Sequence, residues 1–260
     1  MLTSLAEAVA AVPDGSTIYL GNFGAQLFAV GHELIRQRRR DVHIIAASGG
    51  ILLDDLIAEG VTRQVTLSHC WNPVGPAKTE HFQRGAQERW LRINELSYGA
   101  MCSALYAAAQ DVPFTTTTNL GSTDYLAPAR SGGMLTTVAC EFGEATAVRA
   151  LAPDIAFLHA AIAAESGDAW LAQPTADVLL AAQASRRTVL VVEELGVGPG
   201  PATVPGLLVE SVVVCPGAVR PDGAAGRYPR DLDAYADYSR QAGTDAGRAA
   251  WRDAVALARG

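Results

Sequence analysis

The side chains that could carry out acid–base chemistry are few and lie far apart in the sequence. The five histidines show no close spacing of the kind that metal ligands have; they are His32, His43, His69, His81 and His159. His43 and His159 lie inside apolar, β-branched runs, which favours buried histidines with structural hydrogen bonds. His69 ends such a run, directly before Cys70 and Trp71, and there a structural role and a functional role both remain open.

Two adjacent carboxylates, Glu193 and Glu194, follow the apolar run TVLVV. Successive residues of a strand point to opposite faces of a sheet, so these two cannot work as a paired acid and base. One of them is expected to face a ligand or a subunit interface, and the other the solvent. We interpret the pair as structural.

Several familiar catalytic motifs are missing from the sequence. It contains no P-loop, no GxGxxG that opens a βαβ unit, no HExxH and no GxSxG. Lys78 is the only lysine, which weighs against Schiff-base chemistry and against sugar-phosphate isomerases of similar fold. The four cysteines are spread singly, as expected of reduced thiols without a metal site; they are Cys70, Cys102, Cys140 and Cys215.

Composition and charge exclude several classes of protein. Of the 260 residues, 49% are hydrophobic and 18% are charged, which is typical of a globular chain, and the net charge of −7 argues against nucleic-acid or membrane-surface partners. A cluster of Arg36, Arg38, Arg39 and Arg40 ends a predicted helix; it either complements the helix dipole or contacts a phosphate group of a ligand. No signal peptide or membrane-spanning run is evident, so we expect a soluble, cytoplasmic protein.

Short apolar runs alternate with longer segments of helical periodicity. The predicted strands are Thr17–Leu20, Val42–Ala47, Val65–Ser68, Ile93–Leu96, Val112–Thr118, Ile155–His159, Thr188–Val192 and Val212–Val214, and the predicted helices are Phe28–Arg39, Ile51–Glu59, Gly99–Gln110 and Ala176–Ser185. This alternation predicts an α/β protein, a three-layer α/β/α domain with a mainly parallel sheet. We expect one domain over residues 1–260, with a helical tail from about residue 228 and a last helix from about Thr244 to Arg259.

Three predicted strands run into glycine-containing loops. The loops hold Asn22 and Gly24, then Gly49 and Gly50, then Gly121 and Ser122. Glycine permits close approach of a ligand to backbone N–H groups, and ligands of parallel sheets bind beyond the carboxyl ends of the strands. We therefore predict that the three loops lie along one sheet edge and that these six residues contact the ligand. Turn formation alone is the alternative role of each glycine.

Four segments form a recognisable series. Near the start, DGSTIYLGNFG precedes a helix that ends HELIRQ, and in the middle stands NELSYGAMCSALYAAAQDVPF. LAPDIAFLHAAIAAESGDAWL comes next, and then SRRTVLVVEEL and VVVCPGAVRPDGAAGRYPRD. The series covers most of residues 14–238. In content and order it resembles the α subunit of family I CoA-transferases, the family of the glutaconate and 3-oxoacid enzymes.

This resemblance implies an enzyme subunit with no permanently bound cofactor. Coenzyme A is a substrate, and it reaches the enzyme as an acyl-CoA, which is the small-molecule partner. In this family the thioester is attacked by a glutamate of the β subunit, which then carries CoA as a glutamyl thioester, because covalent catalysis divides one difficult transfer into easier steps. The α subunit supplies an oxyanion-stabilising group and part of the pocket. We therefore expect a heteromer with a β-type subunit, of α2β2 stoichiometry, and an α chain that is inactive alone.

Tyr98 departs from the family pattern. The 3-oxoacid transferases carry Gln at this position, where its amide resembles an oxyanion donor, and related ring-opening hydrolases of steroid degradation carry Glu. A phenol can donate to an oxyanion, and the start of a helix after the predicted N-cap Ser97 favours developing negative charge. A phenol cannot replace a carboxylate base. Tyr98 is thus the candidate catalytic residue, with packing as its alternative role.

Two other functions compete with CoA transfer. One is a CoA-thioester hydrolase on the same scaffold, which opens a ring by water attack beside a carbonyl. The other is a non-catalytic ligand-sensing domain of the kind found in some transcription regulators. Such regulators carry a basic DNA-binding module at the N-terminus, whereas the predicted fold begins within the first twenty residues of this sequence.

Overall fold

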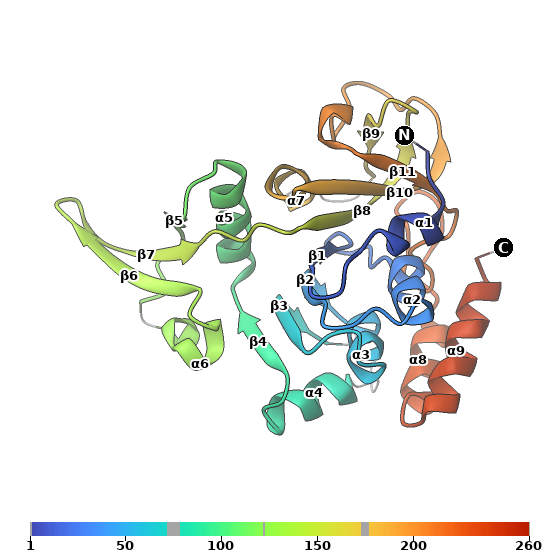
Figure 1. Cartoon of the computed structure of the whole chain (residues 1–260), viewed down its shortest axis with the longest axis horizontal. Coiled ribbons are helices and arrows are strands. Elements are labelled where there is room, and N and C mark those ends of the chain that lie inside the picture. The colour runs from blue at the N-terminus through green and yellow to red at the C-terminus, as the bar shows by residue number, and fades with distance from the viewer. Residues whose placement is uncertain (1, 72–78, 122, 173–176, 260) are drawn as a thin grey trace.

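A computed structural model describes residues 2–71, 79–121, 123–172 and 177–259 and shows a central, mostly parallel sheet (Figure 1). Its strand order is β11-β10-β8-β1-β2-β3-β4, and β9 pairs antiparallel with β8. The strands are β1 (Thr17–Leu20), β2 (His43–Gly49), β3 (Gln64–Cys70), β4 (Arg92–Glu95), β8 (Ile155–Ala163), β9 (Ala169–Trp170), β10 (Arg187–Leu195) and β11 (Ser211–Val214). From β1 the chain adds strands toward β4 at one edge of the sheet, and from β8 it adds strands toward β11 at the other edge. The topological switch point therefore lies between β1 and β8.

Helices cover both faces of this sheet because the strands are apolar on both sides. Ile18 packs in one core with α2, α3, α8 and α9, whereas its neighbour Tyr19 packs in the other with α5 and α7. The helices are α1 (Leu5–Ala10), α2 (Phe28–Arg36), α3 (Ile51–Ala58), α4 (Glu80–Gln87), α5 (Tyr98–Ala109), α7 (Val178–Ala184), α8 (Leu232–Gln241) and α9 (Asp245–Leu257). The predicted three-layer α/β/α fold with a mainly parallel sheet is confirmed.

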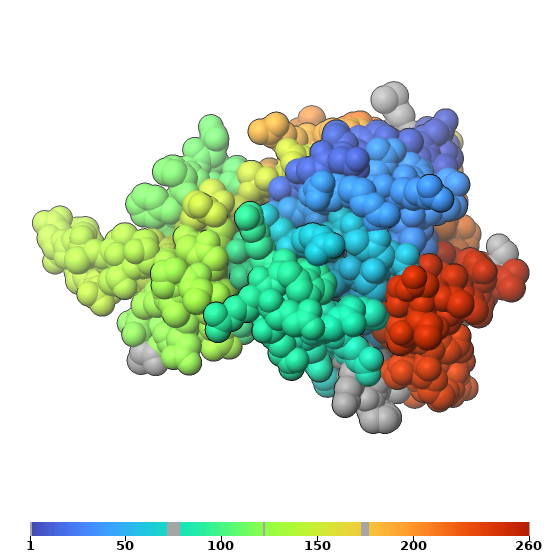
Figure 2. Space-filling view, turned by 60° about the horizontal axis from the view of Figure 1, so that its bottom comes forward, coloured from blue at the N-terminus to red at the C-terminus, as the bar shows by residue number. Residues whose placement is uncertain are grey.

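A second, antiparallel sheet stands apart from the first. It has the order β5-β7-β6, formed by β5 (Phe114–Thr116), β6 (Leu135–Cys140) and β7 (Gly143–Arg149). The short elements around it and in the later loops are η1 (Asp124–Leu126), α6 (Pro128–Ser131) and η2 (Gly206–Leu208). Figure 2 shows the β6–β7 hairpin as an arm at the end of the molecule opposite the C-terminal helices.

The second sheet corrects one sequence-based prediction. The run Val112–Thr118 does not supply a strand of the parallel sheet; only Phe114–Thr116 is a strand, and it pairs antiparallel with β7, Thr115 opposite Val148. Pairing between distant segments decided this outcome, since a threonine run suits either sheet. The β6–β7 hairpin was missed because its Ala, Glu and Gly residues weaken the strand pattern.

The predicted C-terminal helical tail is present and packs on the domain. α9 begins after Thr244, whose hydroxyl accepts a hydrogen bond from Gly247 N. Trp251 is fully buried beside α8, and Arg248 Nε donates to Glu59, the residue that follows α3, at 3.1 Å. Ion pairing and burial thus fasten the tail to the helical layer. Within the described residues, no helix is long and apolar enough to cross a membrane.

Candidate active site

A tight turn follows β1 at the switch point of the sheet. Asn22 N donates to Ala25 O, and Ala25 N donates to Asn22 O, both at 3.1 Å. Gly24 has a φ of +84°, a conformation that favours glycine and closes the turn. The turn presents Phe23, which remains 38% exposed despite its large apolar ring.

Asn22 fixes this turn to the neighbouring strand β8. Its Nδ2 donates to His159 O at 2.8 Å, and its Oδ1 accepts from His159 N at 3.0 Å. The side chain is buried, so both polar atoms are used inside the protein. Asn22 therefore holds the switch point together, and its predicted contact with CoA stays a prediction.

The second glycine loop lies beside the first. Gly49 ends β2, where a Cβ atom would come within 2.7 Å of Leu53 Cδ2. Gly50 caps α3, where a Cβ atom would come within 2.6 Å of Nε2 of Gln26, the residue that follows the Phe23 turn. A Cβ atom at either position would displace the end of a side chain, and the packing of Gln26 on Gly50 brings these two loops together.

The third loop reaches the same region from the other sheet. Gly121 is exposed, and its N–H donates to Asn119 Oδ1 at 2.9 Å. Thr118 Oγ1 is 3.6 Å from where a Cβ atom of Gly99 would stand, at the start of α5. The expectation that all three loops follow strands of one sheet is wrong, because β5 belongs to the second sheet. Ser122 lies outside the described residues, and the common ligand site remains a prediction.

Tyr98 occupies its predicted place in the first turn of α5. The Ser97 hydroxyl caps this helix by accepting from Ala100 N at 3.1 Å. The Tyr98 ring is half-buried, and its centroid lies 5.2 Å from that of Phe23. The N-terminus of α5 and the turn at the switch point therefore meet at this pair of rings.

A buried carboxylate that sequence reasoning missed, Asp177, lies behind Tyr98. Its Oδ2 accepts from the Tyr19 hydroxyl and from Phe23 N, the latter at 3.3 Å, and no hydrogen bond from the described residues reaches Oδ1. Burial, the Asp177 carboxylate and the Cys102 thiol all raise the pKa of Tyr98. The phenol therefore carries its proton at neutral pH and is a hydrogen-bond donor.

The sequence feature that could have drawn attention to Asp177 is its position directly before α7. That position suggests a helix-capping role, which differs from the role that the structure shows. An Asp at this position normally caps its helix by accepting a backbone N–H. Here Asp177 makes no such bond, because its side chain turns to the residues of β1 and the following turn. Sequence spacing could not reveal this, since Tyr19 and Asp177 are 158 positions apart.

His69 stands at the same edge as Tyr98. Ser48 and His69 are partners in the β2–β3 register, and Ser48 Oγ lies 2.8 Å from His69 Nε2. The His69 ring centroid is 6.2 Å from that of Phe23, in an edge-on arrangement. Burial lowers the pKa of His69, so the imidazole is neutral at pH 7. Phe23 is thus in contact with His69 and with Tyr98.

The Glu193–Glu194 pair has the structural role that the sequence suggested. Glu193 is buried and bonds His159 Nε2 at 2.9 Å and the Tyr228 hydroxyl at 2.7 Å. Glu194 points the other way and pairs with Arg227 at 2.7 Å. His159 is accordingly a satisfied core histidine, as its position in an apolar run indicated.

Three arginines of the cluster, Arg36, Arg39 and Arg40, have partners within the protein, and the alternative contact with a CoA phosphate stays a prediction. Arg36 forms an ion pair with Glu33, Arg39 donates to Ala10 O at 2.9 Å, and Arg40 donates to the carbonyl of Glu59. In the described part of the chain, no group of three or more His, Cys, Asp or Glu side chains could hold a metal ion.

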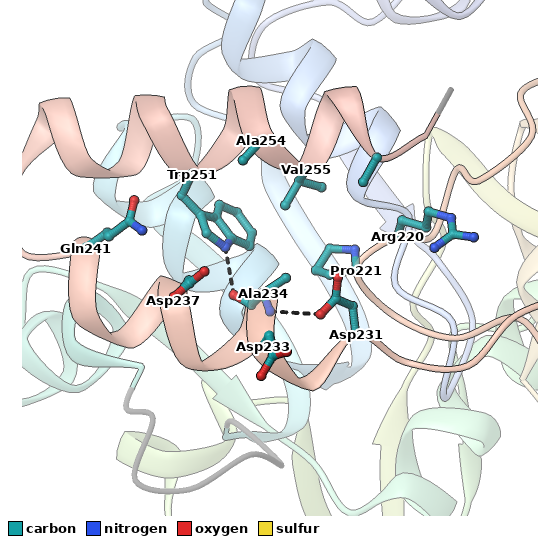
Figure 3. Close-up of a pocket in the computed structure, with 11 residues that line it drawn as sticks. Arg220, Pro221, Asp231, Asp233, Ala234, Asp237, Gln241, Trp251, Ala254 and Val255 are labelled. Atoms are coloured by element: carbon teal, nitrogen blue, oxygen red, sulfur yellow. Dashed lines mark hydrogen bonds between the residues drawn. The ribbon is translucent and has the colours of Figure 1, made fainter.

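A well-formed pocket lies elsewhere, between α8 and α9 (Figure 3). It encloses about 260 Å³ and contains none of the predicted site residues. Three aspartates line it with Arg220, namely Asp231, Asp233 and Asp237. Such a lining repels phosphate groups, so we do not assign CoA binding to it. Figure 3 shows two hydrogen bonds among its lining residues, from Trp251 Nε1 to Ala234 O and from Ala234 N to Asp231.

Comparison with known proteins agrees with this architecture. Residues 2–215 match the family model described as coenzyme A transferase. Over 245 residues the chain is 29% identical to the A-type component of 3-oxoadipate CoA-transferase from Pseudomonas knackmussii, covering 90% of this chain and 86% of that protein.

Two solved structures resemble the whole chain. A variant of the decarboxylase AibA/AibB has a TM-score of 0.88 and 28% identity, covering 99% of this chain and 98% of that one. Glutaconate coenzyme A-transferase from Acidaminococcus fermentans has a TM-score of 0.85, with 96% and 86% coverage, and at 21% identity it supports the fold alone. The chain therefore belongs to the coenzyme A transferase family, as a subunit of the α type.

Proposed function

We propose that this chain, as an α-type subunit, works with a β-type partner to move CoA between an acyl-CoA and a carboxylic acid, and that Tyr98 stabilises the oxyanion of that reaction. One observation carries the role of Tyr98: its protonated phenol opens α5 beside the Phe23 turn, at the switch point of the sheet. Ligands of open α/β sheets bind at such points.

Tyr98 would act where negative charge develops. When a carboxylate attacks a thioester, the C–O bond forms, the carbonyl π pair moves to oxygen, and that oxygen becomes an oxyanion before CoA leaves as a thiolate. A phenol O–H and the N-terminal end of a helix both stabilise this charge. The attacking glutamate comes from the partner in the family that this sequence resembles, so the chain alone would lack its nucleophile.

The glycine loops would form the wall of the CoA site. Gln26, which follows the turn with Gly24, packs on Gly50, and Thr118, which precedes the loop with Gly121, lies beside Gly99 at the N-terminus of α5. Backbone N–H groups in such loops suit the phosphates and the pantetheine amides of CoA. Asn22 supports this wall by fixing the first loop to β8.

The β-type partner and the cytoplasmic location are parts of this proposal. The relative from Pseudomonas knackmussii is named as one subunit of its enzyme, which supports a second kind of subunit here. CoA and its acyl thioesters are the substrates of the proposed reaction, and that reaction needs no permanently bound cofactor.

The experiment is co-expression of the chain with a β-type protein encoded next to it, followed by incubation of the purified heteromer with acyl-CoA and acetate. Transfer produces acetyl-CoA and releases the original carboxylic acid. The proposal is rejected if the assembled heteromer moves CoA from no member of a panel of straight-chain, dicarboxylic and 3-oxo acyl-CoAs.

A hydrolase is the second candidate, and one observation favours it. The variant of the decarboxylase AibA/AibB matches nearly the whole chain at 28% identity, so chemistry other than CoA transfer occurs on this architecture. A hydrolase would open a ring of a CoA thioester by attack of water beside a carbonyl. In the same incubation it would change the acyl group and form no acetyl-CoA.

A further inference from the structure

His69 is a neutral base that the proposed transfer reaction does not use. CoA transfer through a carboxylate nucleophile needs an oxyanion donor, and it removes no proton from carbon. His69 nevertheless lies half-buried at the C-terminal end of β3, beside the turn that Tyr98 contacts.

The surroundings of His69 orient one of its two ring nitrogens. Nε2 is 2.8 Å from Ser48 Oγ, on the adjacent strand and in direct register. Among the described residues, no hydrogen bond is made to Nδ1. The centroid of the His69 ring lies 6.2 Å from that of Phe23 and 6.5 Å from that of Trp71. When Nε2–H donates to the serine, Nδ1 carries a free lone pair, as a general base requires.

His69 and Tyr98 both lie beside the ring of Phe23. The Phe23 centroid lies 6.2 Å from His69 and 5.2 Å from Tyr98, so both groups border the turn that Phe23 caps. A thioester whose carbonyl oxygen accepted from the Tyr98 phenol, with its acyl carbons along this turn, would bring the carbon next to that carbonyl toward His69.

We propose that the assembled enzyme enolises its acyl-CoA, with His69 as the base and Ser48 as its positioning residue. His69 Nδ1 takes a proton from the carbon next to the thioester carbonyl. The C–H electron pair becomes the C=C bond, the carbonyl π pair moves to oxygen, and Tyr98 donates to the enolate. Return of a proton from the imidazole restores the acyl-CoA, so no oxidant or further reactant is needed. This inference rests on the proposed binding of acyl-CoA beside Tyr98.

Deuterium exchange tests the inference. The heteromer is incubated in D2O with propionyl-CoA or succinyl-CoA and 13C-labelled acetate; mass spectrometry then gives deuterium in the acyl group and transfer of CoA in one sample. The parent should incorporate deuterium at the carbon next to the carbonyl. Because general-base catalysis contributes about 100-fold or more, His69→Gln should lower the ratio of exchange to transfer by about 50-fold or more. Gln keeps a donor to Ser48 but cannot take the proton.

Two further variants separate a base from a merely structural residue. Ser48→Ala retains the imidazole and frees its ring, and it should lower the exchange-to-transfer ratio by roughly tenfold, a part of the general-base effect. His43→Gln is the matched control, because His43 lies at the start of β2, away from the C-terminal edge, and should leave both rates unchanged.

The outcomes distinguish the inference from the proposed function. Transfer without deuterium incorporation by the parent overturns the inference alone. Equal loss of exchange and transfer in His69→Gln also overturns it, since His69 would then only support the site. Absence of both activities with the full acyl-CoA panel rejects the proposed function and this inference together.

Discussion

The side chain of Asn22 binds the main chain of His159 with both of its amide atoms, at 2.8 Å and 3.0 Å. The two residues lie 137 positions apart and belong to the two halves of the sheet that meet at the switch point. The turn that presents Phe23 to Tyr98 and His69 is therefore fastened at its base by one buried amide.

Asn22→Ala should weaken the fold at this point. It would remove both hydrogen bonds that the Asn22 amide makes with the main chain of buried His159, and the loss of a buried hydrogen-bond partner costs about 1–3 kcal/mol. We expect a loss of roughly 2–4 kcal/mol in the free energy of unfolding, measured by urea titration. Asn119→Ala is the matched control at an exposed position, where the loss should stay below about 1 kcal/mol. Equal effects of the two substitutions would contradict the role of Asn22.

Tyr98→Phe should slow turnover of the assembled heteromer without unfolding it. The ring and its contact with Phe23 remain, but one hydrogen-bond donor is lost. Loss of one oxyanion donor typically costs about 100-fold or more in turnover, roughly 3 kcal/mol of barrier. Steady-state kinetics with acyl-CoA and acetate measure this. A rate within about twofold of the parent, roughly 0.4 kcal/mol, would assign Tyr98 to packing.

Tyr98→Gln provides the complementary test. Gln occupies this position in the 3-oxoacid transferases that the sequence resembles, and its amide can donate to an oxyanion. We expect it to recover part of the rate that Tyr98→Phe loses. A Gln variant as slow as the Phe variant would show that the phenol acts through some property other than donation.

The isolated chain should show no acyl-CoA turnover, and it should be homo-oligomeric or poorly soluble. With its β-type partner it should form a stable α2β2 assembly, with more than roughly 1,000 Å² buried at the contact. Sedimentation of the chain alone, of the partner alone and of their mixture measures this. Robust turnover by the purified chain alone would contradict the prediction.

The protein should lose stability in mild acid, in part through His43. Burial lowers the pKa of His43 from its ordinary value near 6.5 to about 4. Between these two values the unfolded chain binds a proton that the folded chain does not, so the free energy of unfolding falls as the pH falls. Between about pH 7 and about pH 4.5 this group should remove on the order of 2 kcal/mol.

His43→Gln isolates that contribution. Gln can keep a hydrogen bond to Thr66 Oγ1, which lies 2.8 Å from His43 Nε2, but does not titrate. The buried His32, whose pKa burial also lowers, titrates in both proteins and cancels from the comparison. The variant should lose about 2 kcal/mol less than the parent between the two pH values, measured by urea unfolding. Identical losses would assign the acid sensitivity to other groups.

Local patterns determined the main architecture from the sequence alone. Apolar β-branched runs separated by helical periodicity predicted the three-layer fold, and the Ser97 cap followed by Tyr98 predicted the start of α5. Adjacent placement on a strand predicted that Glu193 and Glu194 would point to opposite sides. In each case the deciding interaction, such as a cap, a periodicity or a strand alternation, spans only a few residues.

Only the tertiary structure decided the contacts between distant segments. It moved Phe114–Thr116 into a second sheet by pairing it with β7, and it turned Asp177 away from its helix toward Tyr19. It also placed Ser48 against His69 by the register of two parallel strands, and both His69 and Tyr98 against Phe23. The sequence carries no local record of such pairings. They depend on strand order and register, which only the packing of the whole chain selects.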